Sequence, residues 1–132
     1  MPELPEVQTV VNYLHRTIQG KTIQSIRLPN KYSGVFENGS LLKYQEFLEG
    51  KQIKSIRRRG KFIIMELGPG FLLIHLRMTG RIVLEKPTIK EMKYVSFQLT
   101  FSDVSNLFFH DIRKFGRIYI CKNLNWLEKK LG

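Results

Sequence analysis

Residues 61–78 read KFIIMELGPGFLLIHLRM, and this stretch decides the fold. Two apolar runs flank Gly68-Pro69-Gly70, which is a strong signal for a turn between two strands. More strand-like segments follow at short intervals along the chain: GRIVLE from residue 80, KYVSFQLTF from 93, NLFFHD from 106 and RIYIC from 117. SDVSN (102–106) is a polar turn between two of them. Beyond residue 60 the chain is therefore mostly β.

Before residue 60 the pattern is helical. Apolar residues recur at helical spacing over 5–18 and 41–48, with Gly20 and Gly50 placed to end each helix and Ser40 able to cap the second. Each helix leads into a nearly identical strand-like segment, GKTIQSIR from residue 20 and GKQIKSIR from residue 50. These two copies indicate two helix-then-strand units.

The expected fold class is thus α+β and mostly β. We predict a two-layer β-sandwich, or flattened barrel, with a long N-terminal helix and a second, shorter helix packed against it. A short helical pattern, NLNWLEKKLG, closes the chain at about 124–132.

Charge is the informative feature of the composition. The chain has 132 residues, enough for one domain, with 22 Lys and Arg against 11 Asp and Glu, a formal net charge of +11. A small domain this basic usually meets a polyanion, and nucleic acid is favoured over a membrane surface because the cations do not follow one amphipathic helix. The single Cys121 excludes an internal disulfide and a multi-cysteine metal site within this chain. We expect a monomeric cytoplasmic protein.

Three stretches could carry chemistry. In SIRRRGKF, cations crowd around Gly60; this is either a solvated strand end or a phosphate clamp with Lys61 as a point charge, and the overall charge favours the clamp. In IHLRMTGR, His75 and Met78 come at a strand end, where both could equally be core residues. In HDIRKFGR, Phe115 lies among cations and is either a core residue or an aromatic wedge for a base stack.

The first six residues, MPELPE, also have two interpretations. Pro5 suits the first turn of a helix, and Glu3 and Glu6 favour the positive end of its dipole. Alternatively, loss of Met1 leaves Pro2 with a free secondary amine. Such an amine can attack an electrophilic sugar carbon as an iminium-forming nucleophile, with Glu3 as general acid.

Taken together, PELPEV, RRRGKF, HLRMTG and DIRKFG resemble the N-terminal domain of the bacterial formamidopyrimidine-DNA glycosylase family, which repairs oxidised purines. The resemblance covers essentially all of residues 1–132. It implies that Pro2 is the Schiff-base nucleophile at C1′ of the damaged nucleotide and that Glu3 donates a proton to the opening sugar. Glu6 would help arrange the site, and Lys61 would bind a phosphate at the lesion and assist elimination.

The resemblance also implies a DNA-binding surface. His75 would contact the backbone, while Met78, Arg113 and Phe115 would fill the space left by a flipped base, with Arg113 facing the orphaned cytosine. Many relatives carry a Lys-His-x-His-Val pattern where this chain reads EMKYV (91–95), so a DNA-contacting histidine is missing and Lys93 is its possible substitute.

Relatives in this family continue into a helix–two-turn–helix domain and a zinc finger, and 124–132 resembles their lead-in. We therefore expect an isolated N-terminal catalytic domain of the glycosylase and abasic-site lyase. It would need no cofactor itself, because zinc belongs to the missing finger. The expected partner is double-stranded DNA with oxidised purines or abasic sites, and the isolated domain is expected to be weak or inactive on duplexes. The alternative is a non-catalytic nucleic-acid-binding β-domain.

Overall fold

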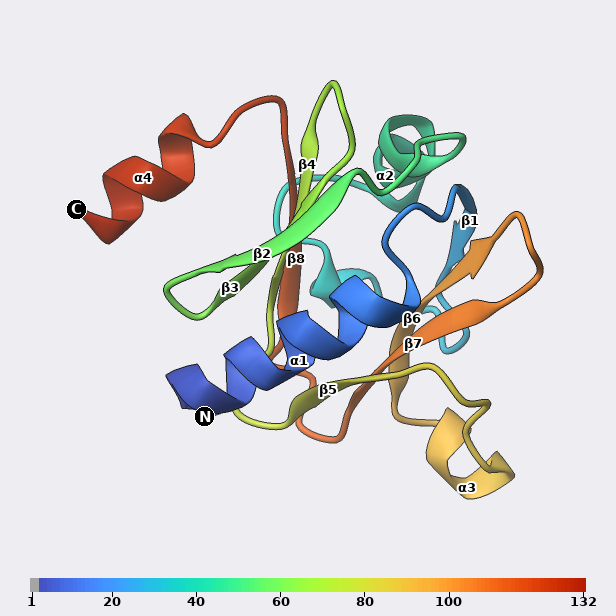
Figure 1. Ribbon diagram of the computed structural model, residues 1–132. Helices are drawn as coiled ribbons and strands as arrows, with labels where there is room; N and C mark the ends of the chain where they lie inside the picture. Colours follow the sequence, from blue (N-terminus) through green and yellow to red (C-terminus); the bar gives the residue numbers. More distant parts are fainter. Residues whose placement is uncertain (1–2) are drawn as a thin grey trace.

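Two four-stranded antiparallel sheets face one another in the computed structural model, which describes residues 3–132 (Figure 1). The first sheet has the order β1 (Ile23–Arg27), β6 (Val95–Phe101), β7 (Asn106–Asp111) and β5 (Gly80–Val83). The second has the order β2 (Ser55–Arg59), β3 (Phe62–Glu66), β4 (Phe71–His75) and β8 (Arg117–Cys121). The predicted two-layer β-sandwich is confirmed.

Helices lie on the edges and outer faces of the sandwich. These are α1 (Leu4–Thr17), α2 (Leu41–Leu48), the short α3 (Ile89–Met92) and α4 (Asn125–Leu131), with one turn of 3₁₀ helix, η1 (Ser33–Val35). Pro5 lies in the first turn of α1, and the Ser40 hydroxyl caps α2 by accepting from the Lys43 N–H, as predicted. The end of α1 differs from the prediction, because the helix stops at Thr17, before Gly20. Within residues 3–132 no helix has the length and apolar content that a bilayer crossing requires.

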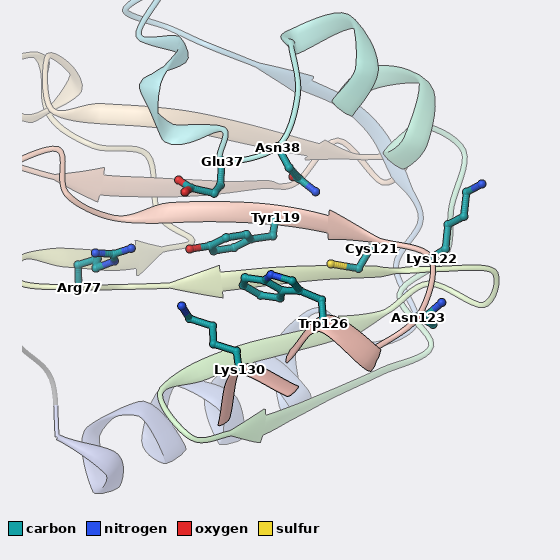
Figure 2. A pocket seen from close by; sticks show the side chains of 9 residues that line it. All are labelled: Glu37, Asn38, Arg77, Tyr119, Cys121, Lys122, Asn123, Trp126 and Lys130. Carbon is teal, nitrogen blue, oxygen red and sulfur yellow. The ribbon is translucent and has the colours of Figure 1, made fainter. Parts of the chain in front are cut away.

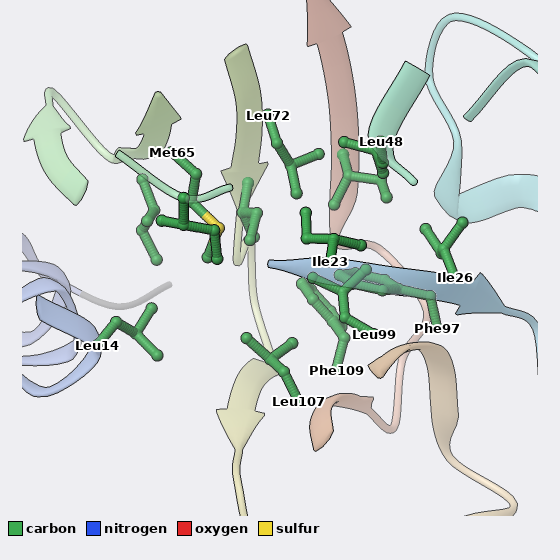
Figure 3. Close-up of a cluster of buried hydrophobic side chains, with 14 of the residues drawn as sticks. Leu14, Ile23, Ile26, Leu48, Met65, Leu72, Phe97, Leu99, Leu107 and Phe109 are labelled. Carbon is green, nitrogen blue, oxygen red and sulfur yellow. The ribbon is translucent and has the colours of Figure 1, made fainter. Parts of the chain in front are cut away.

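The main core fills the space between the sheets and extends under α1 and α2 (Figure 3). Leu14 of α1, Ile23 of β1, Leu72 of β4 and Phe109 of β7 are all fully buried in it. Apolar residues at alternating positions on both sheets supply the rest, as expected for strands with one face against a core.

The repeated GK-x-I segments pair with each other. The Gly20 N–H donates to the Ile53 carbonyl and the Gly50 N–H to the Ile23 carbonyl, each at 2.8 Å. Helix α1 packs on β2, whereas α2 packs on β1, so each helix covers the strand of the other unit. The two copies of the repeat therefore contact each other reciprocally. Because β1 and β2 belong to different sheets, this contact joins the two sheets at one corner.

Helix α4 covers the outer face of the second sheet. Leu127 is fully buried against Phe62, Leu73 and Tyr119, which form a second apolar cluster. This explains why β4 is buried on both faces rather than alternating, since one face meets the main core and the other meets α4.

Candidate active site and nucleic-acid interface

Most of the predicted functional residues gather at one end of the sandwich. Strand pairing fixes this arrangement, because the paired ends of neighbouring strands lie side by side: Phe62 with His75, His75 with Arg117, and Gly80 with Asp111. The β2–β3 turn, the end of β4, the start of β5 and the β7–β8 loop therefore share this end (Figure 1).

The first turn of α1 adjoins the same end. Glu3 and Glu6 are exposed there, and Glu3 is the residue that precedes the helix. One turn further on, the side chain of Gln8 accepts a hydrogen bond from the Arg58 Nε at 3.1 Å, which ties the start of α1 to the β2–β3 hairpin. The predicted nucleophile, Pro2, precedes Glu3 in the sequence and lies outside the described residues.

The arginines of SIRRRGKF are engaged in contacts within the fold. Arg58 also donates to the Gly60 carbonyl at 2.9 Å, and Arg59 forms an ion pair with Glu128 of α4 at 3.1 Å. Arg57 lies 3.9 Å from the Glu66 carboxylate on the neighbouring strand. Lys61 is half-buried at the tip of the hairpin, where Gly60 adopts a positive φ of 61°. Because the three arginines make contacts within the fold, we expect Lys61 to be the residue that binds a phosphate. The phosphate clamp itself stays a prediction.

His75 lies half-buried at the end of β4. Its Nδ1 accepts the backbone N–H of Arg77 at 3.1 Å, and its ring meets the Phe62 ring edge-on at 4.8 Å. Burial, helped by the positive charges of Arg77 and Lys61, lowers the pKa of His75 from 6.5 to about 4. The imidazole is therefore neutral at pH 7 and carries its hydrogen on Nε2, where it can donate to a phosphate oxygen.

Met78 and Phe115 are both surface residues. The two residues are 46% and 45% exposed, so the interpretation of either as a core residue is wrong. Met78 does not continue the strand, because β4 ends at His75 and Arg77 turns the chain with a φ of 58°. Exposed large apolar side chains on neighbouring loops are typical of a binding surface.

Arg113 stacks on the neighbouring aromatic residue. Its guanidinium lies 5.3 Å from the centroid of the Phe115 ring, and its own side chain is exposed. A cation held against an exposed ring is suited to enter a base stack and to donate to a base edge.

The β7–β8 loop is anchored by residues that sequence reasoning missed. The Tyr32 hydroxyl donates to the Lys114 carbonyl at 3.0 Å, and Arg117 Nη1 donates to the same carbonyl at 2.8 Å. Arg117 in turn lies 3.6 Å from the Glu37 carboxylate. These contacts hold the loop backbone on its β8 side while leaving the Phe115 ring exposed. No local sequence signal links Tyr32 with a loop 82 residues away.

Lys93 lies on a different corner. It is exposed, it follows α3, and its Nζ is 5.1 Å from the Tyr94 ring centroid. Asn30 fixes this corner by donating to the carbonyls of Met92 and Val95, each at 2.9 Å. Lys93 is thus near the start of β6, and its predicted contact with DNA stays a prediction.

A hollow of about 540 Å³ opens beside α4 (Figure 2). Trp126 lies against Tyr119 there with ring centroids 5.0 Å apart, and Arg77 and Lys130 are at one end of the hollow. The hollow adjoins the His75 side of the predicted site, because Arg77 and Lys130, which both line it, contribute to the lowered pKa of His75. Arg77 and Lys130 also place positive charge on the α4 side of the predicted site.

The described residues also bear on metal and thiol chemistry. Among residues 3–132 no group of three or more His, Cys, Asp and Glu side chains is placed to hold a metal ion. Burial raises the pKa of the free thiol of Cys121, so this side chain is poorly suited to act as a nucleophile at neutral pH.

Comparison with known proteins agrees with this arrangement. Residues 1–118 match the family described as Formamidopyrimidine-DNA glycosylase N-terminal domain. Formamidopyrimidine-DNA glycosylases from an Exiguobacterium species and from Bacillus subtilis are 38% and 39% identical over 125 and 124 residues, covering 93% and 92% of this chain.

Solved structures share the fold. A MutM complex with DNA containing carbocyclic 8-oxo-G is 34% identical with a TM-score of 0.85. Lactococcus lactis Fpg bound to DNA with an abasic site is 33% identical with a TM-score of 0.84. Each covers 98% of this chain and 48% of the solved chain. The two curated relatives are covered over 44% of their length, so this chain spans less than half of the proteins it matches.

Proposed function

The chain belongs to the formamidopyrimidine-DNA glycosylase family, which it matches through the N-terminal domain, and on that premise we propose that it serves base-excision repair. Its substrate would be bacterial DNA in the cytoplasm that contains oxidised purines such as 8-oxoguanine and formamidopyrimidines. The reaction would remove the base and then cleave the strand at the abasic site.

One observation carries the proposal. Met78 and Phe115, both about half exposed, project from two loops at the same end of the sandwich as Lys61, His75 and the start of α1. A domain that only bound the DNA backbone would need cations there but no exposed apolar pair. Two apolar side chains beside an arginine suit a vacated position in a base stack, which arises when a base is flipped out.

The chemistry would begin at Pro2 after removal of Met1. The secondary amine attacks C1′ of the damaged nucleotide, the glycosidic bond breaks, and the leaving base departs with a proton. The iminium then forms between the Pro2 nitrogen and C1′ as the sugar ring opens and its ring oxygen takes a proton from Glu3. A general base then takes the 2′ proton, the electrons of that C–H bond form the C2′–C3′ double bond, and the C3′–O bond breaks, which releases the 3′ phosphate and cleaves the strand.

The described residues would support these steps from fixed positions. Glu3, which precedes α1, and Glu6, in its first turn, are both exposed and lie close to the nucleophile in sequence. Lys61 would hold a phosphate at the hairpin tip, and neutral His75 would donate a hydrogen bond from Nε2 to the backbone. Lys93 would contact DNA from the neighbouring corner.

A chain of residues 1–132 would work poorly on intact duplex. With Met1 retained, the Pro2 nitrogen is part of an amide and has no free lone pair. In addition, flipping a base costs a few kcal/mol, which contacts across bent DNA must offset. A polypeptide limited to residues 1–132 would supply only the contacts that this one domain can make. A single-stranded abasic substrate needs no flipping and should be affected least.

The alternative function is a nucleic-acid-binding β-domain without catalysis, which the net charge of +11 alone would support. An assay of the chain with and without Met1 on duplex 8-oxoguanine and single-stranded abasic oligonucleotides separates the two. Cleavage of the abasic strand only by the Met1-free form supports the proposal. Binding without cleavage by either form would favour the alternative, and strong duplex excision by the Met1-bearing form would exclude Pro2 as the nucleophile.

A further inference from the structure

Asp111 is a fully buried carboxylate at the end of β7, immediately before the loop that carries Arg113 and Phe115. A carboxylate removed from water needs hydrogen bonds to be tolerated. Both of its oxygens are used, and they reach two different loops. Neither hydrogen bond is part of the strand pairing, so strand pairing alone does not account for a buried carboxylate at this position.

One oxygen reaches the β4–β5 connection. Asp111 Oδ1 accepts from the Thr79 hydroxyl at 2.6 Å, directly after Met78. The same hydroxyl oxygen accepts the backbone N–H of Arg113 at 3.1 Å. Thr79 therefore links the loop of Met78 to the loop of Arg113 through the buried carboxylate.

The other oxygen reaches the far side of the β7–β8 loop. Asp111 Oδ2 accepts the Gly116 N–H at 2.7 Å, directly after Phe115. One side chain thus fixes the residue after Met78 and the residue after Phe115 at the same time.

Both loops also rest on one aromatic ring. A Cβ added to Gly80 would lie 2.8 Å from Cζ of Phe109, and one added to Gly116 would lie 2.5 Å from the same atom. The ring of Phe109 is fully buried, so it cannot move aside cheaply. The two loops are held close together by this ring from below and by the carboxylate between them.

We infer that Asp111, with Thr79, is a positioning residue that holds Met78, Arg113 and Phe115 as one preformed unit for insertion into a base stack. The inference rests on the proposed function and deepens it. Because the two loops are already ordered in the free protein, DNA binding does not have to offset the entropy lost in ordering them. This is the usual benefit of preorganisation. The role concerns only duplex with a vacated base position, because a single strand has no such gap to fill.

The test compares variants of the Met1-free chain for binding to a duplex with one abasic position and to the same abasic strand alone. Asp111→Asn keeps one acceptor oxygen but cannot accept from both Thr79 and Gly116. Thr79→Val removes the hydroxyl at nearly constant shape, and Thr79→Ser restores it. Asp103→Asn is the control, since Asp103 also accepts from a hydroxyl but lies in the turn between β6 and β7, at the other end of β7.

We expect Asp111→Asn and Thr79→Val to weaken duplex binding by roughly tenfold, the scale of one lost hydrogen bond to a charged group. Binding to the single strand should change less than about twofold, Thr79→Ser should recover most of the Thr79→Val loss, and Asp103→Asn should bind like the wild type. Adding Phe115→Ala to Asp111→Asn should cost less than the sum of the two losses.

Hydrogen exchange of the free protein gives a second measurement that does not depend on DNA. In Asp111→Asn the amides of Arg113 and Gly116 should lose protection together, while core amides of β7 keep theirs. Unchanged duplex binding by a folded Asp111→Asn chain, or equal losses on duplex and single strand, would overturn the inference and leave the proposed function standing. A wild type with no preference for the abasic duplex over undamaged duplex would instead overturn both.

Discussion

Truncation of Phe115 to alanine separates a binding residue from a core residue. Phe115 is 45% exposed, and the exposed Arg113 guanidinium lies 5.3 Å from the centroid of its ring. Phe109 is the matched control, because it is the same residue type on the preceding strand and is fully buried.

The expected loss of stability for each variant follows from how far its ring is buried. Full burial of a phenylalanine side chain is worth about 1.5–3 kcal/mol, so removing a half-exposed one should cost roughly 1–1.5 kcal/mol of the free energy of unfolding. The exposed Arg113 contact adds about 0.5 kcal/mol. Phe109→Ala should cost about 3–5 kcal/mol, as other core truncations do. Loss of one aromatic stack on a base should weaken duplex binding by about 1–3 kcal/mol, or roughly 5- to 150-fold.

Two measurements check this prediction: urea unfolding of each variant, and fluorescence anisotropy of a labelled abasic duplex at one fixed salt concentration. Phe115→Ala should lose only about 1.5–2 kcal/mol of the free energy of unfolding, clearly less than Phe109→Ala, and should bind the duplex much more weakly. The reasoning is refuted if Phe115→Ala loses as much stability as Phe109→Ala, or if it binds the abasic duplex as tightly as the wild type does.

The other predictions concern charge and protonation. Lys61→Ala should reduce the slope of log affinity for duplex DNA against log salt concentration by about 0.9, the value for one lost phosphate contact. Lys43→Ala, on the distant α2, is the control and should leave this slope unchanged. Equal slopes for the two variants would exclude the phosphate clamp at Lys61. For His75, the unfolded chain takes up a proton as the pH falls below 6.5, but the folded chain does so only near 4. The free energy of unfolding should therefore fall as the pH drops from 6.5 to 4, and His75→Gln should make that fall shallower; an imidazole NMR titration with a midpoint near 6.5 would contradict this.

Much of the fold could be predicted because its signals are local. Apolar runs on either side of Gly68-Pro69-Gly70 predict a hairpin, and β3 and β4 form it. The Ser40 cap and the Pro5 start of a helix are likewise local. The burial of β4 on both faces could not be predicted from the residues of β4 alone, because it depends on where α4 packs.

The candidate site divides in the same way. Lys61 and Phe115 stand out in sequence because a cation beside glycine and an aromatic residue among cations are unusual. Asp111 and Thr79 do not stand out, because their pairing spans 32 residues and requires the β5–β7 pairing to exist first. The sequence thus predicted the exposed side chains that we propose contact DNA, but not the buried groups that hold their loops in place.

Borohydride trapping tests the central claim most directly, because reduction by borohydride converts an iminium into a stable crosslink. The Met1-free chain is incubated with an abasic oligonucleotide and borohydride, and the crosslinked peptide is located by mass spectrometry. We predict a crosslink at Pro2 in the Met1-free chain and none in the Met1-bearing chain. A crosslink of equal yield with Met1 present, or one that maps to a lysine, would contradict the assignment of Pro2 as the nucleophile.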